Sequence, residues 1–119
     1  MARPSYTLVP WTKTGTTSGI VNLTGNQLIG FVLPSTIAST AITFNMALAM
    51  DKVSTLAPVA DSTGNTISFT VTATTFKYYG FSQDQIAKFN GVEILQMVAG
   101  SSETLNQSIY LVTIPRPSI

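Results

Sequence analysis

Strict alternation of apolar and hydroxyl-bearing residues is the feature that most limits the folds open to this chain. Residues 61–73 read DSTGNTISFTVTA, and after the glycine every second residue is apolar: Ile67, Phe69 and Val71. The positions between them hold only hydroxyl side chains: Thr66, Ser68 and Thr70. Because successive side chains of a β-strand point to opposite faces, this period of two predicts a strand with one buried and one exposed face.

Short β-like runs separated by turn residues continue along the chain. They are GIVNL, QLIGFVL, TAITFNMALAM, VSTLAPV, TTFKYYGF, VEILQMV and SIYLVTI. The segment TGN at residues 24–26 predicts a tight hairpin between the first two runs. In the third run we expect a core-facing set: Ile42, Phe44, Met46 and Leu48. The last two runs are apolar on both faces, which predicts central strands.

One segment has helical rather than β character. In residues 82–89, Ser82 suits an N-cap, Asp84 falls in the first turn, and the apolar residues Ile86 and Phe89 are three positions apart. Asn90 and Gly91 follow and favour a helix end. We expect a helix of at most two turns here.

Together these elements predict an all-β fold. The chain of 119 residues has the length of one domain. Seven or eight short strands with regular turns indicate a single antiparallel β-sandwich of the jelly-roll type over residues 19–114, with one short helix. A small barrel is the alternative.

The two ends of the sequence are predicted to be extended arms. Residues 1–18 contain Pro4 and Pro10, and residues 115–119 contain Pro115 and Pro117. The first arm carries large apolar residues that we expect at a contact with another subunit: Tyr6, Leu8, Val9 and Trp11. The alternative is that this arm covers its own domain. In the tail, the expected contact residues are Pro115, Pro117 and Ile119.

Charge is scarce in this chain. Charged residues make up 9% of it, against about 25% in typical soluble domains. Serine and threonine, 12 and 18 residues, take their place. Interfaces disfavour lysine and carboxylates, so a surface rich in hydroxyls is compatible with burial against other protein. The net charge of +1, with scattered basic residues, argues against nucleic-acid and membrane partners. The first residues lack the apolar stretch of a secretory signal, which favours synthesis in the cytoplasm.

Nothing in the sequence indicates catalysis, a cofactor or a metal site. The absence of histidine and cysteine removes the common nucleophile schemes and zinc ligand sets. The turn that begins at Asp61 lacks the spacing of a calcium loop, so we expect Asp61 to bond its own backbone. A sugar-stacking platform is the alternative use of the aromatic residues Tyr6, Trp11, Tyr78, Tyr79 and Tyr110.

The order of strands and turns resembles that of a known group of proteins. The resemblance begins with NQLIGFVLPS, continues through TAITFNMALAMDKVSTLAPVADSTGNTISFTV and FNGVEILQMVAGSS, and ends with LNQSIYLVTIPRP. This pattern is similar to that of small β-sandwich virion proteins of tailed bacteriophages, over about 90 residues from Gly19 to Pro117.

The resemblance implies a structural role and no catalytic residues. It leads us to expect a capsid cement or decoration protein on the outside of the shell, made in the host cytoplasm. The expected partners are the major capsid protein and further copies of the chain, as a dimer or trimer. A tail or neck component and a carbohydrate-binding module are the alternatives.

Overall fold

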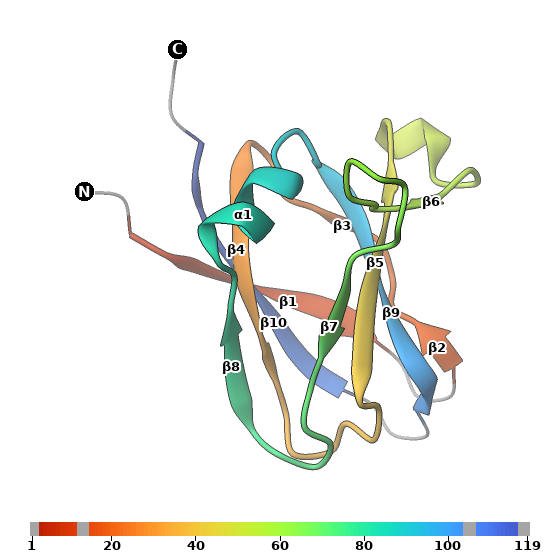
Figure 1. Ribbon diagram of the computed structural model, residues 1–119, viewed down its shortest axis with the longest axis vertical. Coiled ribbons are helices and arrows are strands. Elements are labelled where there is room, and N and C mark those ends of the chain that lie inside the picture. Colours follow the sequence, from red (N-terminus) through yellow and green to blue (C-terminus); the bar gives the residue numbers. More distant parts are fainter. Residues whose placement is uncertain (1–2, 12–14, 104–106, 117–119) are drawn as a thin grey trace.

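The computed structural model describes residues 3–11, 15–103 and 107–116, which form one all-β globule (Figure 1). The elements, in chain order, are β1 (Ser5–Trp11), β2 (Gly15–Thr17), β3 (Val21–Asn22), β4 (Asn26–Leu33), β5 (Ala41–Ala47), the 3-10 turn η1 (Met50–Lys52), β6 (Ala57–Pro58), β7 (Ser68–Thr70), β8 (Lys77–Gly80), α1 (Gln83–Lys88), β9 (Ile94–Glu103) and β10 (Gln107–Pro115). Among the described residues, no helix is long and apolar enough to cross a membrane.

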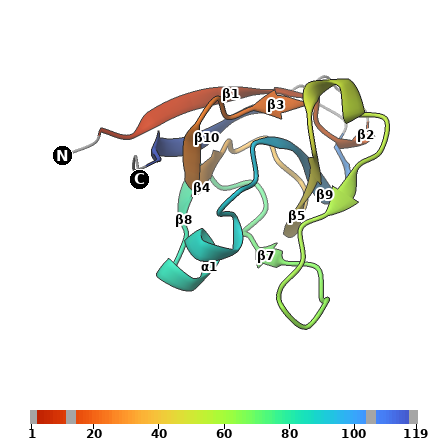
Figure 2. The same ribbon diagram turned by 90° about the horizontal axis from the view of Figure 1, so that it is seen from above.

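The strands form two antiparallel sheets. Sheet A has the order β1-β10-β4-β8, and sheet B has the order β2-β9-β5-β6, with β3 also paired to β9 and β7 to β5. Seen from above, β4 and β8 lie across the interior from β5 and β9 (Figure 2). The structure is therefore a sandwich, as expected, rather than a small barrel.

The pairing of the strands is nested along the sequence. β1 pairs with β10, β2 and β3 with β9, β4 with β8, and β5 with both β6 and β7. Nested antiparallel pairs amount to one long hairpin that folds over itself into two sheets. This is the strand order of a jelly roll, and the predicted fold class is confirmed.

A cluster of aromatic rings fills the space between the sheets. Phe31 of β4 and Phe44 of β5 lie 5.9 Å apart between ring centroids. Phe69 meets Phe31 edge-on at 5.5 Å, and Phe81 stacks on Phe69 at 4.7 Å. Aromatic pairs in these geometries stabilise a core by about 0.5–1.5 kcal/mol each beyond the area that they bury. The rings therefore join sheet A to sheet B.

The alternation of apolar and hydroxyl-bearing residues at 66–71 has the predicted consequence. Phe69 and Val71 are buried, and Ile67 is half-buried against the same core. Thr66, Ser68 and Thr70 are exposed. The strand itself is short, since β7 spans only Ser68–Thr70.

The short helix is also confirmed. The Ser82 hydroxyl accepts a hydrogen bond from the backbone N–H of Gln85, and the Gln85 side chain accepts one from the backbone N–H of Ser82. This reciprocal pair is a capping box, which satisfies two donors that a helix start leaves free. Beyond the helix, Gly91 has a φ of +89°, a conformation that glycine tolerates best.

Two local expectations are wrong. The residues at 24–26 do form a tight turn, in which Asn26 N–H donates to the Leu23 carbonyl at 3.2 Å. The strands on either side do not pair with each other, because β3 joins sheet B and β4 joins sheet A. The second error concerns Leu48, which is 85% exposed instead of core-facing, because β5 ends at Ala47 and the chain turns outward.

The N-terminal segment is extended but is built into the sandwich. Residues of β1 pair with β10 from Ser5↔Thr113 to Trp11↔Gln107, so β1 is an edge strand of sheet A. β2 pairs with β9 at an edge of sheet B. The expected alternative, in which this segment covers its own domain, describes residues 3–11 and 15–17 better than a separate arm does.

Candidate functional site

An apolar row crosses the outer face of sheet A from one edge to the other. The strand register pairs Leu8 with Tyr110, Tyr110 with Val32, and Val32 with Tyr78. Neighbouring strands lie about 4.8 Å apart, so these four side chains, one from each strand, stand side by side. Their inward-facing sequence neighbours, such as Phe31 and Leu111, are in the core. The row therefore faces solvent.

The side chains of this face are unusually exposed for their size. The exposed fractions are 66% for Tyr6, 55% for Leu8, 75% for Phe76, 53% for Tyr78 and 39% for Tyr110. Together with Val32, these residues are named the aromatic face below. Single exposed apolar residues are common, but a contiguous group of this kind marks a binding surface.

The aromatic face is hollowed near its centre. The hollow has a volume of about 480 Å³ and is lined by Tyr6, Val32, Phe76, Lys77, Tyr78 and Tyr110. Its lining contains no carboxylate and no side-chain amide. The available chemistry is apolar contact, ring stacking and three phenol hydroxyls, while the ammonium group of Lys77 lies by the Tyr79 ring.

Two glycines hold the ring of Tyr78 flat against the sheet. Gly30 of β4 pairs with Gly80 of β8, in the row next to the one that contains Tyr78. A Cβ placed on Gly30 would lie 2.8 Å from Cε1 of Tyr78, and one placed on Gly80 would lie 3.1 Å from Cε2. The ring thus covers the space that two side chains would otherwise fill, which is a known compensation for glycine in sheets. The ring of Tyr78 therefore lies against the backbone of β4 and β8 at these two glycines.

Exposed charge is nearly absent from both broad faces of the sandwich. In the described strands of sheet A the only charged residue is Lys77, whose ammonium group lies 5.8 Å from the ring centroid of Tyr79. In the described strands of sheet B the only charged residue is Glu103, which is fully buried. The other described charges lie outside the strands: Arg3, Asp51, Lys52, Asp61, Asp84, Lys88, Glu93 and Arg116.

The outer face of sheet B carries hydroxyls and amides in place of aromatic rings. Thr43 pairs with Ser68 on one side and with Val98 on the other, and Val98 pairs with Thr17. In the next row the Asn45 amide donates to the Gln96 side chain at 3.2 Å. These polar residues, Thr17, Thr43, Asn45, Ser68, Thr70 and Gln96, are named the hydroxyl face below.

Glu103 is a buried carboxylate that is surrounded by hydrogen-bond donors. It accepts hydrogen bonds from the backbone N–H of Ala38 at 2.8 Å and of Ser39 at 2.9 Å, and also from the Ser39 hydroxyl. The Gln107 amide donates to it at 3.3 Å. These donors satisfy the buried charge. The cluster fastens the connection between β4 and β5 to the ends of β9 and β10.

The turn at Asp61 has the predicted form. One carboxylate oxygen of Asp61 accepts from the hydroxyl of Thr63 at 2.7 Å, from its backbone N–H at 2.9 Å and from the backbone N–H of Asn65 at 3.0 Å. The Thr63 hydroxyl, with the N–H of Asn65 next, holds the pKa of Asp61 below its ordinary value. Within the part of the chain that the structure describes, no three His, Cys, Asp or Glu side chains gather as metal ligands.

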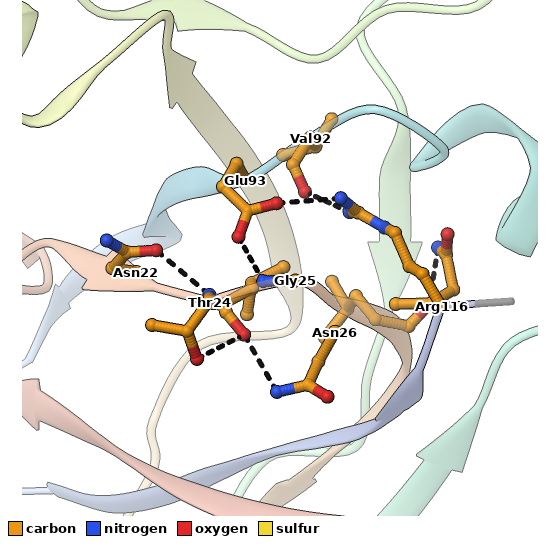
Figure 3. A network of polar contacts seen from close by, with 10 residues as sticks. Asn22, Thr24, Gly25, Asn26, Val92, Glu93 and Arg116 are labelled. Atoms are coloured by element: carbon orange, nitrogen blue, oxygen red, sulfur yellow. Dashed lines mark hydrogen bonds and ion pairs between the residues drawn. The ribbon is translucent and has the colours of Figure 1, made fainter. Parts of the chain in front are cut away.

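The end of β10 is tied to the rest of the domain (Figure 3). Glu93 accepts from Arg116 at 2.7 Å and from the backbone N–H of Gly25. Arg116 also donates to the Val92 carbonyl at 2.6 Å. Pro115, an expected contact residue, is exposed and pairs with Asn26 at the end of the strand. Pro117 and Ile119, two further expected contact residues, lie outside the described residues.

The four expected contact residues of the N-terminal segment divide by strand alternation. Tyr6 and Leu8 are on the aromatic face, whereas Val9 and Trp11 are 1% and 4% exposed in the core. Val9 and Trp11 thus pack inside their own domain, which is the alternative considered for this segment, because β1 is a sheet strand in which these two residues point inward. Of the aromatic set considered for sugar stacking, Tyr79 is also turned inward, stacked on Phe31 at 5.3 Å.

Four contributors to the aromatic face were not expected from the sequence as a protein contact: Val32, Tyr110, Phe76 and Tyr78. A period-two signal is present for the last two, since Phe76 and Tyr78 alternate with Lys77 and Tyr79.

Comparisons of the chain with protein-family models, with curated proteins and with solved structures find no match.

Proposed function

We propose that this protein is a structural component of a tailed-bacteriophage virion, a cement or decoration protein that binds the outside of the capsid and bridges neighbouring major capsid subunits. The proposal joins the resemblance in strand and turn order to one structural observation. Within the strands that the structure describes, both broad faces of the sandwich lack exposed charge apart from Lys77, while the other described charges lie in the connections and at the ends of strands.

Scarcity of charge on the faces supports burial against protein. Removing an unpaired lysine or carboxylate from water at an interface costs several kcal/mol of binding free energy. These faces avoid that cost because they carry almost no charge. The hydroxyl face suits a partner that is also soluble on its own, because interfaces between such proteins are about as polar as ordinary surface and are bridged by water. We assign the capsid contact to this face.

The mechanism of stabilisation is mass action. A protein that binds the assembled lattice and not separated subunits makes the lattice harder to open. Each contact can be weak, since two contacts held at a fixed spacing act together with high effective concentration. If the protein is instead a tail or neck component, the same combination of weak contacts at fixed spacing would stabilise its assembly with tail or neck proteins.

A carbohydrate-binding role is the second candidate, and one observation favours it. Tyr6, Tyr78 and Tyr110 line one hollow, as rings that stack on sugars do. Against it stands the lining, which offers no carboxylate or side-chain amide to bind sugar hydroxyls. Protein binding fits this surface better.

The proposal is tested by adding purified protein to particles that lack it, followed by sedimentation of the particles. Ser68→Lys places a charge on the hydroxyl face, in the edge strand β7 beside Thr43, and Ser62→Lys adds the same charge in the exposed turn before β7. We expect wild type and Ser62→Lys to sediment with the particles and Ser68→Lys to be left in solution. Wild-type protein that stays in solution at all concentrations contradicts the capsid role.

A further inference from the structure

We infer that the aromatic face is the interface of a two-fold symmetric homodimer. The inference does not rest on the capsid role, because it concerns the purified chain alone. It assigns the two broad faces to two kinds of partner: the aromatic face to a second copy, and the hydroxyl face to other protein.

The apolar character of the face favours a permanent partner. Homodimer interfaces are about 65% apolar, whereas interfaces between proteins that also exist apart are about 56–58% apolar, like the rest of the surface. On the aromatic face, Tyr6 and Phe76 are 66% and 75% exposed, and a contiguous group of large exposed apolar side chains is typical of a surface that another protein covers. A second copy is present wherever the chain is present.

The five large side chains supply more than half of the area that a dimer of standard size buries. Since an aromatic side chain buries about 150–250 Å², the exposed parts of the five large side chains offer on the order of 500 Å² per copy. A specific interface of standard size buries about 800 Å² per partner. The remaining residues of the four-stranded face, including Val32 and Ser108, can supply the difference.

The charge distribution is compatible with self-association. A two-fold axis brings the same patch of both copies together, so any charge on that patch meets its own image. The strands of sheet A contain no carboxylate and a single lysine, Lys77, which lies over the Tyr79 ring at the sheet edge. Like-charge repulsion across the axis is therefore small.

The face also has the features of a binding hot spot. Tyr78 is held in place by Gly30 and Gly80, so little side-chain freedom is lost when a partner covers it. The hollow beside it can receive a projecting side chain, and Phe76 and Leu8 of the second copy are exposed and apolar. Aromatic anchors of this kind carry most of the binding free energy in interfaces.

Sedimentation equilibrium of the purified chain tests the inference. We expect a species of twice the 12.7 kDa chain mass at micromolar concentration. Phe76→Lys and Leu8→Lys each change a side chain that points away from the core, and each is expected to weaken the dimer by at least about 100-fold. Ser62→Lys is the matched control and should leave the dimer unchanged. Circular dichroism checks that every variant is folded.

Cross-linking locates the interface independently. The chain has no cysteine, so Ser108→Cys introduces a single thiol on the outer side of β10, and Ser62→Cys introduces one outside the face. Mild oxidation should link Ser108→Cys into covalent dimers much faster than Ser62→Cys. A wild-type monomer at millimolar concentration overturns the inference, as does a dimer that both lysine variants retain. A monomer whose tyrosine fluorescence responds to a neutral oligosaccharide also overturns it and assigns the hollow to sugar.

Discussion

The ring of Tyr78 occupies the space that a side chain at Gly30 would need. An added Cβ on Gly30 would lie 2.8 Å from Cε1 of Tyr78 and 2.7 Å from the backbone carbonyl oxygen of Tyr79. Glycine at this position thus allows two things: β4 and β8 can approach each other closely, and the exposed ring of Tyr78 can lie against the sheet. The shape of the aromatic face depends on this pair of residues.

The Gly30→Ala variant is expected to be less stable than the wild type and to displace the ring of Tyr78 from its position against the sheet. The backbone carbonyl cannot move as a side chain does, so overpacking should lower the free energy of unfolding by about 2 kcal/mol. Gly80→Ala is the comparison, because the three atoms nearest to its added Cβ all belong to the Tyr78 side chain, the closest at 3.1 Å. That variant should cost less than about 1 kcal/mol while still displacing the ring. Urea unfolding measures both values, and equal costs would show that the carbonyl contact is unimportant.

Replacement of the buried Glu103 by glutamine should destabilise the fold. The backbone N–H groups of Ala38 and Ser39 each donate to a different oxygen of the carboxylate. Glutamine offers one oxygen and turns an NH₂ group toward one of these donors, so we expect a loss of about 2–3 kcal/mol in the free energy of unfolding. Asp84→Asn, at an exposed i,i+4 ion pair with Lys88, should change it by less than about 0.5 kcal/mol. A small effect at Glu103 would mean that this cluster does not fasten the connection.

Thr74 is expected to be a site where glycine stabilises the protein. Its φ of +56° lies in the left-handed region, which is costly for a β-branched residue. Its backbone N–H donates to the Ile37 carbonyl at 2.8 Å, and glycine retains that bond. Thr74→Gly should raise the free energy of unfolding by about 1 kcal/mol, whereas Thr70→Gly within β7 should lower it. Thermal unfolding of the two variants measures the difference, and a decrease in both would contradict the strain at Thr74.

The turn at Asp61 should make a small pH-dependent contribution to stability. Its pKa is lowered in the folded state, first by the Thr63 hydroxyl, so folding favours the ionised carboxylate. The resulting stability is present above the unfolded pKa, near pH 4, and is lost as the pH falls through the folded pKa. Thr63→Val removes that hydroxyl and should raise the pKa of Asp61, as carboxyl NMR titration can measure.

The matching control is Thr66→Val, an exposed change outside the turn's hydrogen bonds. It should leave the pKa of Asp61 where it is. The stability difference between wild type and Thr63→Val should shrink as the pH is lowered from 7 to below about 3. A difference that stays constant over this range would show that the hydroxyl stabilises the turn without acting on the charge.

The parts of the fold that local physics determines could be predicted from the sequence. Ser82 and Gln85 form their capping box within one turn of chain, and Phe69 and Val71 point inward because of a period that is visible in four residues. The jelly-roll class follows from the number and spacing of such runs. These features need no knowledge of distant residues.

The errors concern distant partners. Whether residues 5–11 form a free arm or a strand depends on β10, about a hundred positions away, and Val9 and Trp11 are buried only because that pairing forms. The turn at 24–26 looks the same whether its two strands pair or enter different sheets. Glu103 could not be recognised as buried, since its donors at residues 38 and 39 carry no sequence signal.

The aromatic face was foreseeable only in pieces. Tyr6, Leu8 and the alternation at 76–79 are visible in the sequence, but the register that lines up Leu8, Tyr110, Val32 and Tyr78 is a property of the whole sheet. The glycine pair beneath Tyr78 likewise becomes meaningful only when β4 and β8 are neighbours.

Electron imaging of virions with and without this protein tests the capsid role most directly. We expect extra density on the outside of the shell, repeated over the lattice and spanning neighbouring capsid subunits. That density should be absent from particles that carry Ser68→Lys and present in those that carry Ser62→Lys. Density confined to the tail or neck, or shells that are identical with and without the protein, would contradict it.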